Sequence, residues 1–210
     1  LWEQGKLATQ VALLRAEPGI PLVGTGIRIL DVEGRSIPRP AHRTRVTHED
    51  LLRSRVAELH PSSFVMRREA FGAVGGMDEE LPGSYAEDYD LLLRMSRHAD
   101  LAMIPAPLTV VRWTGGSYFF SRWQTIAEAL EYLLRKHPDL AEHPHGSARI
   151  LGQIAFARAA MGQRRFALQA MRRAISARAW EPRIALAGLV TAGLSADLVQ
   201  RTLHRLGRGI

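Results

Sequence analysis

The fold is decided by the stretch Pro-Ser-Ser-Phe-Val-Met-Arg-Arg-Glu-Ala-Phe-Gly-Ala-Val-Gly-Gly (residues 61–76), a turn, and then Glu-Asp-Tyr-Asp-Leu-Leu-Leu-Arg (residues 87–94). The short apolar run Ser63–Met66 predicts a buried strand. Residues 68–74 have room for one or two helical turns, and the glycine pair 75–76 suits a left-handed stop. The order strand, short helix, turn and helix predicts an α/β fold.

Glu87 and Asp88 open the second helix of this stretch, whose inner side is formed by Leu91, Leu92 and Met95. A carboxylate in the first turn is favoured by the helix dipole and is a common cap. The residues alone therefore leave two interpretations of Asp88, a structural cap or a reactive carboxylate.

Composition bounds the class of protein. The 210 residues suffice for one sizeable domain, or for one domain plus an appendage. The absence of Cys excludes a disulfide framework and a thiolate metal site. The longest uncharged run, residues 184–196, is too short to span a bilayer.

Charge is distributed unevenly along the chain. The net charge is +7, yet residues 147–210 alone hold eleven Arg, no Lys and two acids, a balance of +9. The basic character therefore belongs to the C-terminal part, where an Arg-rich helix face is either a solvated surface or a contact with anionic lipid or an acidic partner. Nucleic-acid binding is not predicted, because aromatic residues are not interleaved with the arginines.

The order of parts in residues 61–94 resembles the acceptor half of family-two glycosyltransferases, which are inverting enzymes with a GT-A fold. The resemblance implies a nucleotide-sugar donor, a saccharide or lipid-linked acceptor, and a divalent metal, Mg²⁺ or Mn²⁺. It implies that Asp88, the second acid of the Glu-Asp pair, is the general base and that Glu87 orients Asp88 or the acceptor. It also implies a role in glycan biosynthesis of a bacterial cell envelope.

Further site residues follow with less support. Ser62, Ser63 and Arg67 are candidates for the acceptor wall, whereas Asp90 is expected to face solvent or to anchor the helix start. In the family, an Arg at a strand end precedes a His that can ligate the metal and a Gly-Ser loop that closes over the donor. Arg112, Gly116 and Ser117 match this pattern. Thr114 stands at the position of the His, and its hydroxyl is a poor substitute for imidazole.

The start of the chain also resembles the family. Trp2–Pro18 is expected to be a helix with Leu7, Val11 and Leu14 on its inner face, and Leu22–Leu30 a strand in which two glycines allow close backbone approach. In the family, a similar Leu-Trp…Lys-Leu…Gln-Val segment follows the metal-binding Asp-x-Asp. Because no such acids stand here, we expect a fragment that lacks the N-terminal nucleotide-binding half and holds no metal ligand of its own.

The basic, proline-rich loop at residues 39–45 is interpreted as a solvated connection, in preference to an anion-binding loop. Residues 47–55 are expected to form a short helix capped by Thr47. Leu101–Ile104 and Leu108–Trp113 are expected to be strands.

The C-terminal part is expected to be helical. Residues 119–136 show helical spacing, and His137, His143 and His145 are interpreted as part of an extended, exposed linker rather than a metal site. Four helices are predicted in residues 147–207, with Ser147 as the first cap. The period of about 35 residues resembles a tetratricopeptide repeat.

We therefore predict an α/β fold, a partial GT-A-like mixed sheet flanked by helices, followed by an all-α extension. The predicted domains are residues 1–118 (acceptor side), 119–146 (connecting helix and linker) and 147–210 (basic helical extension). The predicted function is glycosyl transfer with inversion, in the cytoplasm or at the inner face of the membrane, the fragment alone being inactive. The alternative is a non-catalytic scaffold that binds a partner through its Arg-rich helices.

Overall fold

The computed structural model describes residues 1–112, 119, 121–178 and 180–205. The described residues form two compact units. The first takes its residues from Leu1–Leu51, Arg55–Asp78 and Glu87–Ser117, and the second from Leu52–Ser54, Glu79–Ala86 and Tyr118–Ile210.

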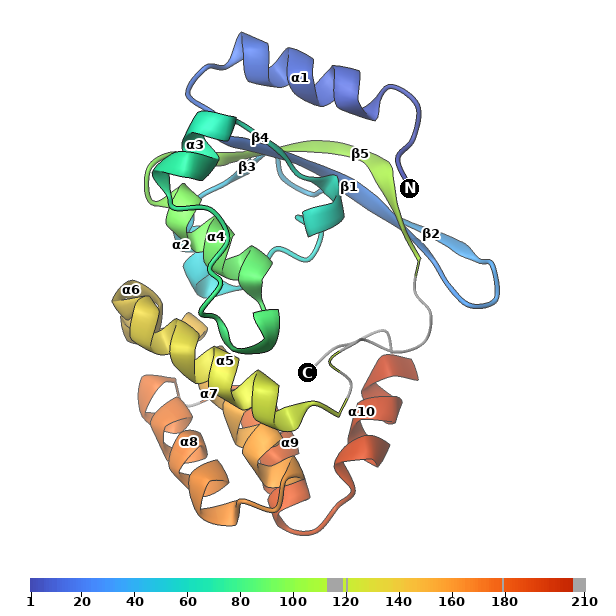
Figure 1. Ribbon diagram of the computed structural model, residues 1–210. Coiled ribbons are helices and arrows are strands. Elements are labelled where there is room, and N and C mark those ends of the chain that lie inside the picture. The colour runs from blue at the N-terminus through green and yellow to red at the C-terminus, as the bar shows by residue number, and fades with distance from the viewer. Residues whose placement is uncertain (113–118, 120, 179, 206–210) are drawn as a thin grey trace. The chain divides into compact units, whose positions relative to one another are not determined.

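A five-stranded sheet forms the first unit (Figure 1). Its strands are β1 (Leu22–Leu30), β2 (Ser36–Arg39), β3 (Arg45–Val46), β4 (Val65–Met66) and β5 (Leu101–Arg112). They run in the order β2-β1-β5-β3, with β4 paired to β1. The β1–β5 pair is parallel and the other pairs are antiparallel, so the predicted mixed sheet is confirmed.

The central strand β1 is almost entirely buried, as its apolar composition requires. Gly24 permits a close approach, because a Cβ there would lie 2.5 Å from Leu59 Cδ1 and 3.3 Å from Ser63 Oγ. The strand thus packs directly against the segment that follows residue 58.

The first helix, α1 (Lys6–Ala16), corrects two expectations. It begins after Gly5, later than Trp2, because Trp2 forms a bridge to Thr109 of β5. Its buried side chains are Lys6, Gln10 and Leu14, whereas Leu7 is 49% exposed. The predicted inner face was therefore wrong for Leu7, because two polar side chains take the buried positions.

The segment between β2 and α2 is held by ion pairs. Arg43 pairs with Asp50 at 2.5 Å, and Arg45 pairs with Glu17. The helix α2 (His48–Arg53) begins after Thr47, whose Oγ1 accepts a hydrogen bond from the Asp50 amide at 3.1 Å. The predicted cap is confirmed.

The stretch that decides the fold forms, in order, the 3₁₀ turn η1 (Pro61–Ser63), β4, α3 (Arg68–Ala73), the turn η2 (Pro82–Ser84) and α4 (Glu87–Ser96). Gly75 and Gly76 have φ angles of 82° and 72°, the left-handed geometry predicted for them. Leu91, Leu92 and Met95 are buried, as predicted for the inner side of α4.

The second unit is helical apart from its turns. Its helices are α5 (Trp123–Lys136), α6 (Pro138–Glu142), α7 (Pro144–Ala160), α8 (Arg164–Ala177), α9 (Pro182–Thr191) and α10 (Ala196–Arg205). The expectation of an extended linker at residues 137–146 was wrong: α6 lies there and His137 is fully buried. Ser147 is not a cap but lies inside α7, whose N-cap is His143.

The apolar residues of α8 are only partly buried. Ala167, Ala170, Met171 and Ala174 face inward, as small residues at a helix contact do. Phe166 and Ile175 of the same helix point outward and are exposed. In the part of the chain that the structure describes, no helix has both the length and the apolar character needed to cross a bilayer.

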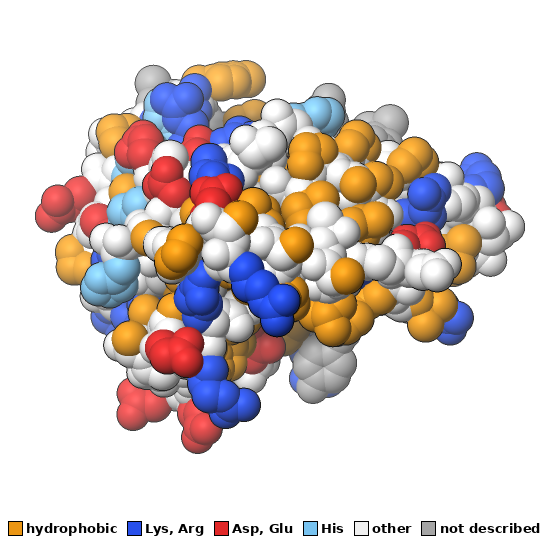
Figure 2. All heavy atoms as spheres, turned by 90° about the horizontal axis from the view of Figure 1, so that it is seen from above, with side chains coloured by type: hydrophobic (Ala, Val, Ile, Leu, Met, Phe, Trp, Pro, Cys, Tyr) orange, Lys and Arg blue, Asp and Glu red, His pale blue; other side chains and the backbone are white. Residues whose placement is uncertain are grey.

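Charged side chains of both signs lie on the face shown in Figure 2, which is seen from above the view of Figure 1. Basic groups there are interspersed with acidic and apolar ones.

Candidate active site

The backbone just before α4 is strained. Ala86 precedes the first helical residue and has a φ of 67°, a left-handed conformation that costs a non-glycine residue about 1 kcal/mol. Such outliers gather at functional sites because the surrounding structure must hold them. Glu87, Asp88 and Asp90 then place three carboxylates in the first turn of α4.

Asp88 is held by an arginine from the loop after α2. Both carboxylate oxygens of Asp88 accept a hydrogen bond from Arg55 Nη2, each at 2.8 Å. The side chain of Asp88 is 16% exposed and that of Arg55 is 41% exposed, so the pair lies at the surface of the first unit. The Arg55 guanidinium also lies 5.6 Å from the centroid of the Tyr89 ring.

Tyr89 fixes α4 from its inner side. The ring is buried, and its hydroxyl donates a hydrogen bond of 2.6 Å to the carbonyl of Leu51 in α2. Because Asp88 directly precedes Tyr89 in the same helical turn, this anchor sets the direction in which the Asp88 carboxylate leaves the helix.

His60 is the third polar group of the site. Burial lowers the pKa of His60 below its usual value of 6.5, the Asp88 carboxylate opposes this change, and the Arg55 guanidinium adds to it. Its Nδ1 accepts a hydrogen bond from the Ser62 amide at 3.2 Å, which places the proton of the neutral ring on Nε2. The site therefore combines a carboxylate, a guanidinium and a neutral imidazole.

Asp90 does not face solvent, which corrects one of the two expectations for it. Its side chain is fully buried and accepts hydrogen bonds from Arg94 Nε at 2.9 Å and Nη2 at 2.6 Å. Arg94 Nη1 also donates to the carbonyl of Val74, at the end of α3. Asp90 therefore joins α4 to α3 through Arg94.

The three residues predicted for the acceptor wall differ in their exposure and in their hydrogen bonds. Ser62 is exposed, whereas Ser63 is buried and its Oγ donates to the carbonyl of His60 at 2.7 Å. The guanidinium of Arg67 is bonded to the carbonyls of Ile20 and Leu14, which favours a structural role. Of the three, Ser62 is the one with its side chain at the surface.

The donor-side predictions lie at or beyond the end of β5. Arg112 is the last residue of β5 and is exposed. Thr114, Gly116 and Ser117 lie outside the described residues, so their predicted contacts stay predictions.

No three His, Asp or Glu side chains within residues 1–112, 119, 121–178 and 180–205 gather where they could hold a metal ion. The described residues therefore do not fit a divalent metal site, and no catalytic step is assigned to a metal here.

Sequence reasoning missed Arg55 and His60. They precede Asp88 by 33 and 28 residues, in a loop whose composition resembles that of other polar loops. The one signal in the sequence that could have pointed to Arg55 is chemical: a carboxylate held away from water, as proposed for Asp88, needs a cation beside it.

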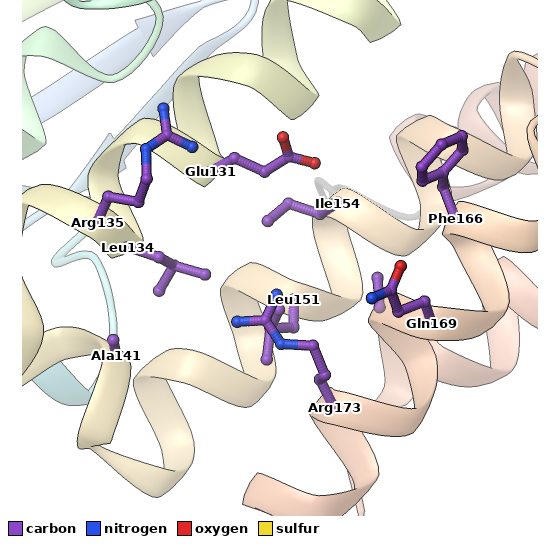
Figure 3. A pocket seen from close by; sticks show the side chains of 10 residues that line it. Glu131, Leu134, Arg135, Ala141, Leu151, Ile154, Phe166, Gln169 and Arg173 are labelled. Atoms are coloured by element: carbon purple, nitrogen blue, oxygen red, sulfur yellow. The ribbon is translucent and has the colours of Figure 1, made fainter.

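A separate cleft of about 300 Å³ lies in the second unit, between α5, α7 and α8 (Figure 3). Leu134, Leu151 and Ile154 make it apolar, while Arg135 and Arg173 contribute positive charge. Its acid, Glu131, forms an ion pair of 2.8 Å with Arg158. The predicted site residues lie in the first unit, so this cleft is a separate feature.

Residues 42–134 match the family model described as "Glycosyltransferase like family 2". No curated protein matches the chain. The matched residues include Arg55, His60, Glu87 and Asp88, and the resemblance predicted from residues 61–94 is thereby confirmed. The match supports glycosyl transfer as the general chemistry of this region.

Proposed function

We propose that the protein transfers a sugar from a nucleotide-sugar donor to a hydroxyl of a saccharide or lipid-linked acceptor, with inversion, and that Asp88 is the general base. The observation that carries the proposal is the Asp88 carboxylate, held by Arg55 at the start of α4 within the matched residues. Glu87, one residue earlier, orients Asp88 or the acceptor.

The reaction follows from the carboxylate. The acceptor oxygen attacks the anomeric carbon from the side opposite the leaving nucleoside diphosphate, while Asp88 takes the hydroxyl proton. The bond from carbon to the diphosphate oxygen breaks with its electron pair. A carboxylate is a weak base, but the hydroxyl becomes acidic as its new bond to carbon forms, so proton transfer contributes about 10²–10⁴-fold.

Arg55 leaves room for this step. Each oxygen of Asp88 accepts one hydrogen bond from Arg55, and each carboxylate oxygen has a second lone pair. The acceptor hydroxyl therefore donates to an oxygen that remains bonded to Arg55. Holding the carboxylate in one direction in this way supplies part of the rate, because orientation is established before the reaction.

The stereochemistry of the reaction is tested by assaying the full-length natural protein that contains these residues. A panel of nucleotide sugars identifies the donor, and proton NMR of the first product gives its anomeric configuration. We expect an α-linked donor to give a β-linked product, because one direct displacement inverts the carbon. A product that retains the donor configuration would rule out a single displacement with Asp88 as its base.

The helical unit is the basis of a second proposal, peripheral contact with an anionic membrane at the inner face. The supporting observation is a stripe on α8 formed by Arg165, Leu168, Arg172 and Ile175, all exposed and spaced so that they share one helix face. Basic and apolar side chains side by side suit the interface of an anionic bilayer.

Two substitutions test this contact. Each Arg near an anionic surface contributes about 1 kcal/mol, so replacing Arg165 and Arg172 by Gln should weaken binding to anionic vesicles about thirtyfold. Binding should also weaken steeply with salt. The matched pair Arg15→Gln and Arg68→Gln, both exposed in the first unit, should change it little. Equal binding to neutral vesicles would contradict the proposal.

A further inference from the structure

Three side chains near the start of the chain converge on the turn η1. Trp2 Nε1 donates a hydrogen bond of 2.9 Å to the carbonyl of Ser62. Lys6 Nζ and Gln10 Nε2 both donate to the carbonyl of Ser63, at 3.0 Å and 2.8 Å. Two successive carbonyls of one turn therefore receive three side-chain donors from a segment more than 50 residues away.

Two of these donors, Lys6 and Gln10, are buried at a cost in desolvation. Lys6 is 1% exposed, Gln10 is fully buried, and burial lowers the pKa of Lys6. Each polar group is nevertheless satisfied. Lys6 Nζ also donates to Gln10 Oε1 at 2.6 Å and lies 4.1 Å from the centroid of the Trp2 ring, and Gln10 Nε2 also donates to the carbonyl of Val23.

A helix that packs on a sheet usually buries an apolar face. Apolar side chains at positions 6 and 10 would therefore pack α1 with a smaller desolvation cost than Lys6 and Gln10. Polar groups that are buried and fully bonded specify one local geometry. The geometry specified here is that of η1.

The turn transmits this geometry to His60. The Ser62 amide donates to His60 Nδ1, and the Ser63 amide and hydroxyl both donate to the His60 carbonyl, at 2.8 Å and 2.7 Å. His60 lies in the same short loop, between α2 and η1, as Arg55, whose guanidinium bonds both oxygens of Asp88.

We propose that Trp2, Lys6 and Gln10 form a clamp of positioning residues that fixes His60, in the loop of Arg55, with its proton on Nε2. In this arrangement the Nε2–H group donates a hydrogen bond to an oxygen of the acceptor saccharide. The second statement rests on the proposed glycosyl transfer, whereas the first does not.

Nitrogen NMR of the His60 ring tests the clamp without an assay of enzymatic activity. Lys6→Met keeps the length of the side chain and removes its ammonium group, and His60→Gln assigns the resonance. We expect the variant to lose the single Nε2–H tautomer and to exchange the Ser62 amide at least tenfold faster. Arg15→Met makes the same change at an exposed position of α1 and should leave both signals unchanged.

A milder variant keeps the test decisive if Lys6→Met does not fold. Trp2→Phe retains a ring beside Lys6 and removes only the donor to the Ser62 carbonyl, at a side chain that is largely exposed. Faster exchange of the Ser62 amide supports the clamp. A His60 spectrum and a Ser62 exchange rate identical to those of the unaltered protein in both variants would overturn it.

Kinetics of the whole protein then test the contact with the acceptor. We expect His60→Gln and Lys6→Met to raise the KM of the acceptor about tenfold and to leave that of the donor unchanged, because one hydrogen bond to the acceptor is lost. An unchanged acceptor KM, together with altered NMR signals, would overturn the role of His60 toward the acceptor. If Asp88→Asn leaves turnover unchanged, the proposed role of Asp88 as base fails, and if the unaltered protein has no turnover, the proposed glycosyl transfer fails. The NMR result decides the clamp in either case.

Discussion

Replacing Asp88 by Asn is expected to lower turnover by about two to four orders of magnitude, because an amide cannot accept the proton of the acceptor hydroxyl. Asn has nearly the same size as Asp and is equally suited to the start of a helix, so folding should change little. The donor KM should hardly move, because the change is confined to the base that serves the acceptor. The measurements are kcat and both KM values of the whole protein, with circular dichroism as the check on folding.

A matched variant separates catalysis from a general effect of lost charge. Asp100→Asn makes the same chemical change at an exposed position after the end of α4, and turnover should be retained. Asp90→Asn is not a suitable comparison, because Asp90 is buried against Arg94. If Asp88→Asn retains full turnover, Glu87 and Asp88 only start a helix, and another group must act as the base. If the unaltered whole protein shows no turnover with any donor, the scaffold that binds a partner becomes the better interpretation.

Replacing Asp90 by Asn is expected to lower the free energy of unfolding of the first unit by about 3 kcal/mol. The substitution leaves the guanidinium of Arg94, whose side chain is only 14% exposed, without its charged partner. Hydrogen exchange of the buried amides in α4 measures this loss within the unit concerned.

The reverse substitution and the double variant complete this experiment. Arg94→Met should destabilise the unit by a similar amount, because it removes the charged partner of the buried Asp90 carboxylate and the donor to the Val74 carbonyl. The double variant should lose much less than the sum of the single losses, since the two side chains contact each other. A change below about 0.5 kcal/mol for Asp90→Asn would mean that the ion pair does not hold α3 and α4 together.

The fold could be predicted from the sequence wherever local patterns were decisive. Leu22–Leu30 forms a strand with the predicted ends, because a continuous apolar run with two glycines suits a buried central strand. The end of α3 followed from a glycine pair for the same kind of reason. In contrast, the linker at residues 137–146 contains a helix, because proline starts a helix as readily as it ends one.

Of the residues in the candidate site, the sequence could predict the carboxylate but not the residues that hold it. Asp88 is visible in the sequence because the start of a helix is a local feature. Its partner Arg55 is 33 residues earlier, and the pairing depends on how the loop after α2 packs. The inner face of α1 was misjudged for a similar reason, since the acceptor that makes a buried Lys6 tolerable is the carbonyl of Ser63, 57 residues away.

The parallel pairing of β1 with β5 has a consequence for how the chain acquires its structure. Val23 pairs with Ala102, which lies 79 residues further along the chain. During synthesis, β1 therefore cannot pair with β5 until the whole of β5 has left the ribosome. Until then, one edge of β1 has no hydrogen-bonded partner strand. Closing so large a loop is slow, because its entropy must be lost before the strand pair compensates for it. The helices α7 and α8, by contrast, follow each other directly and need no such delay.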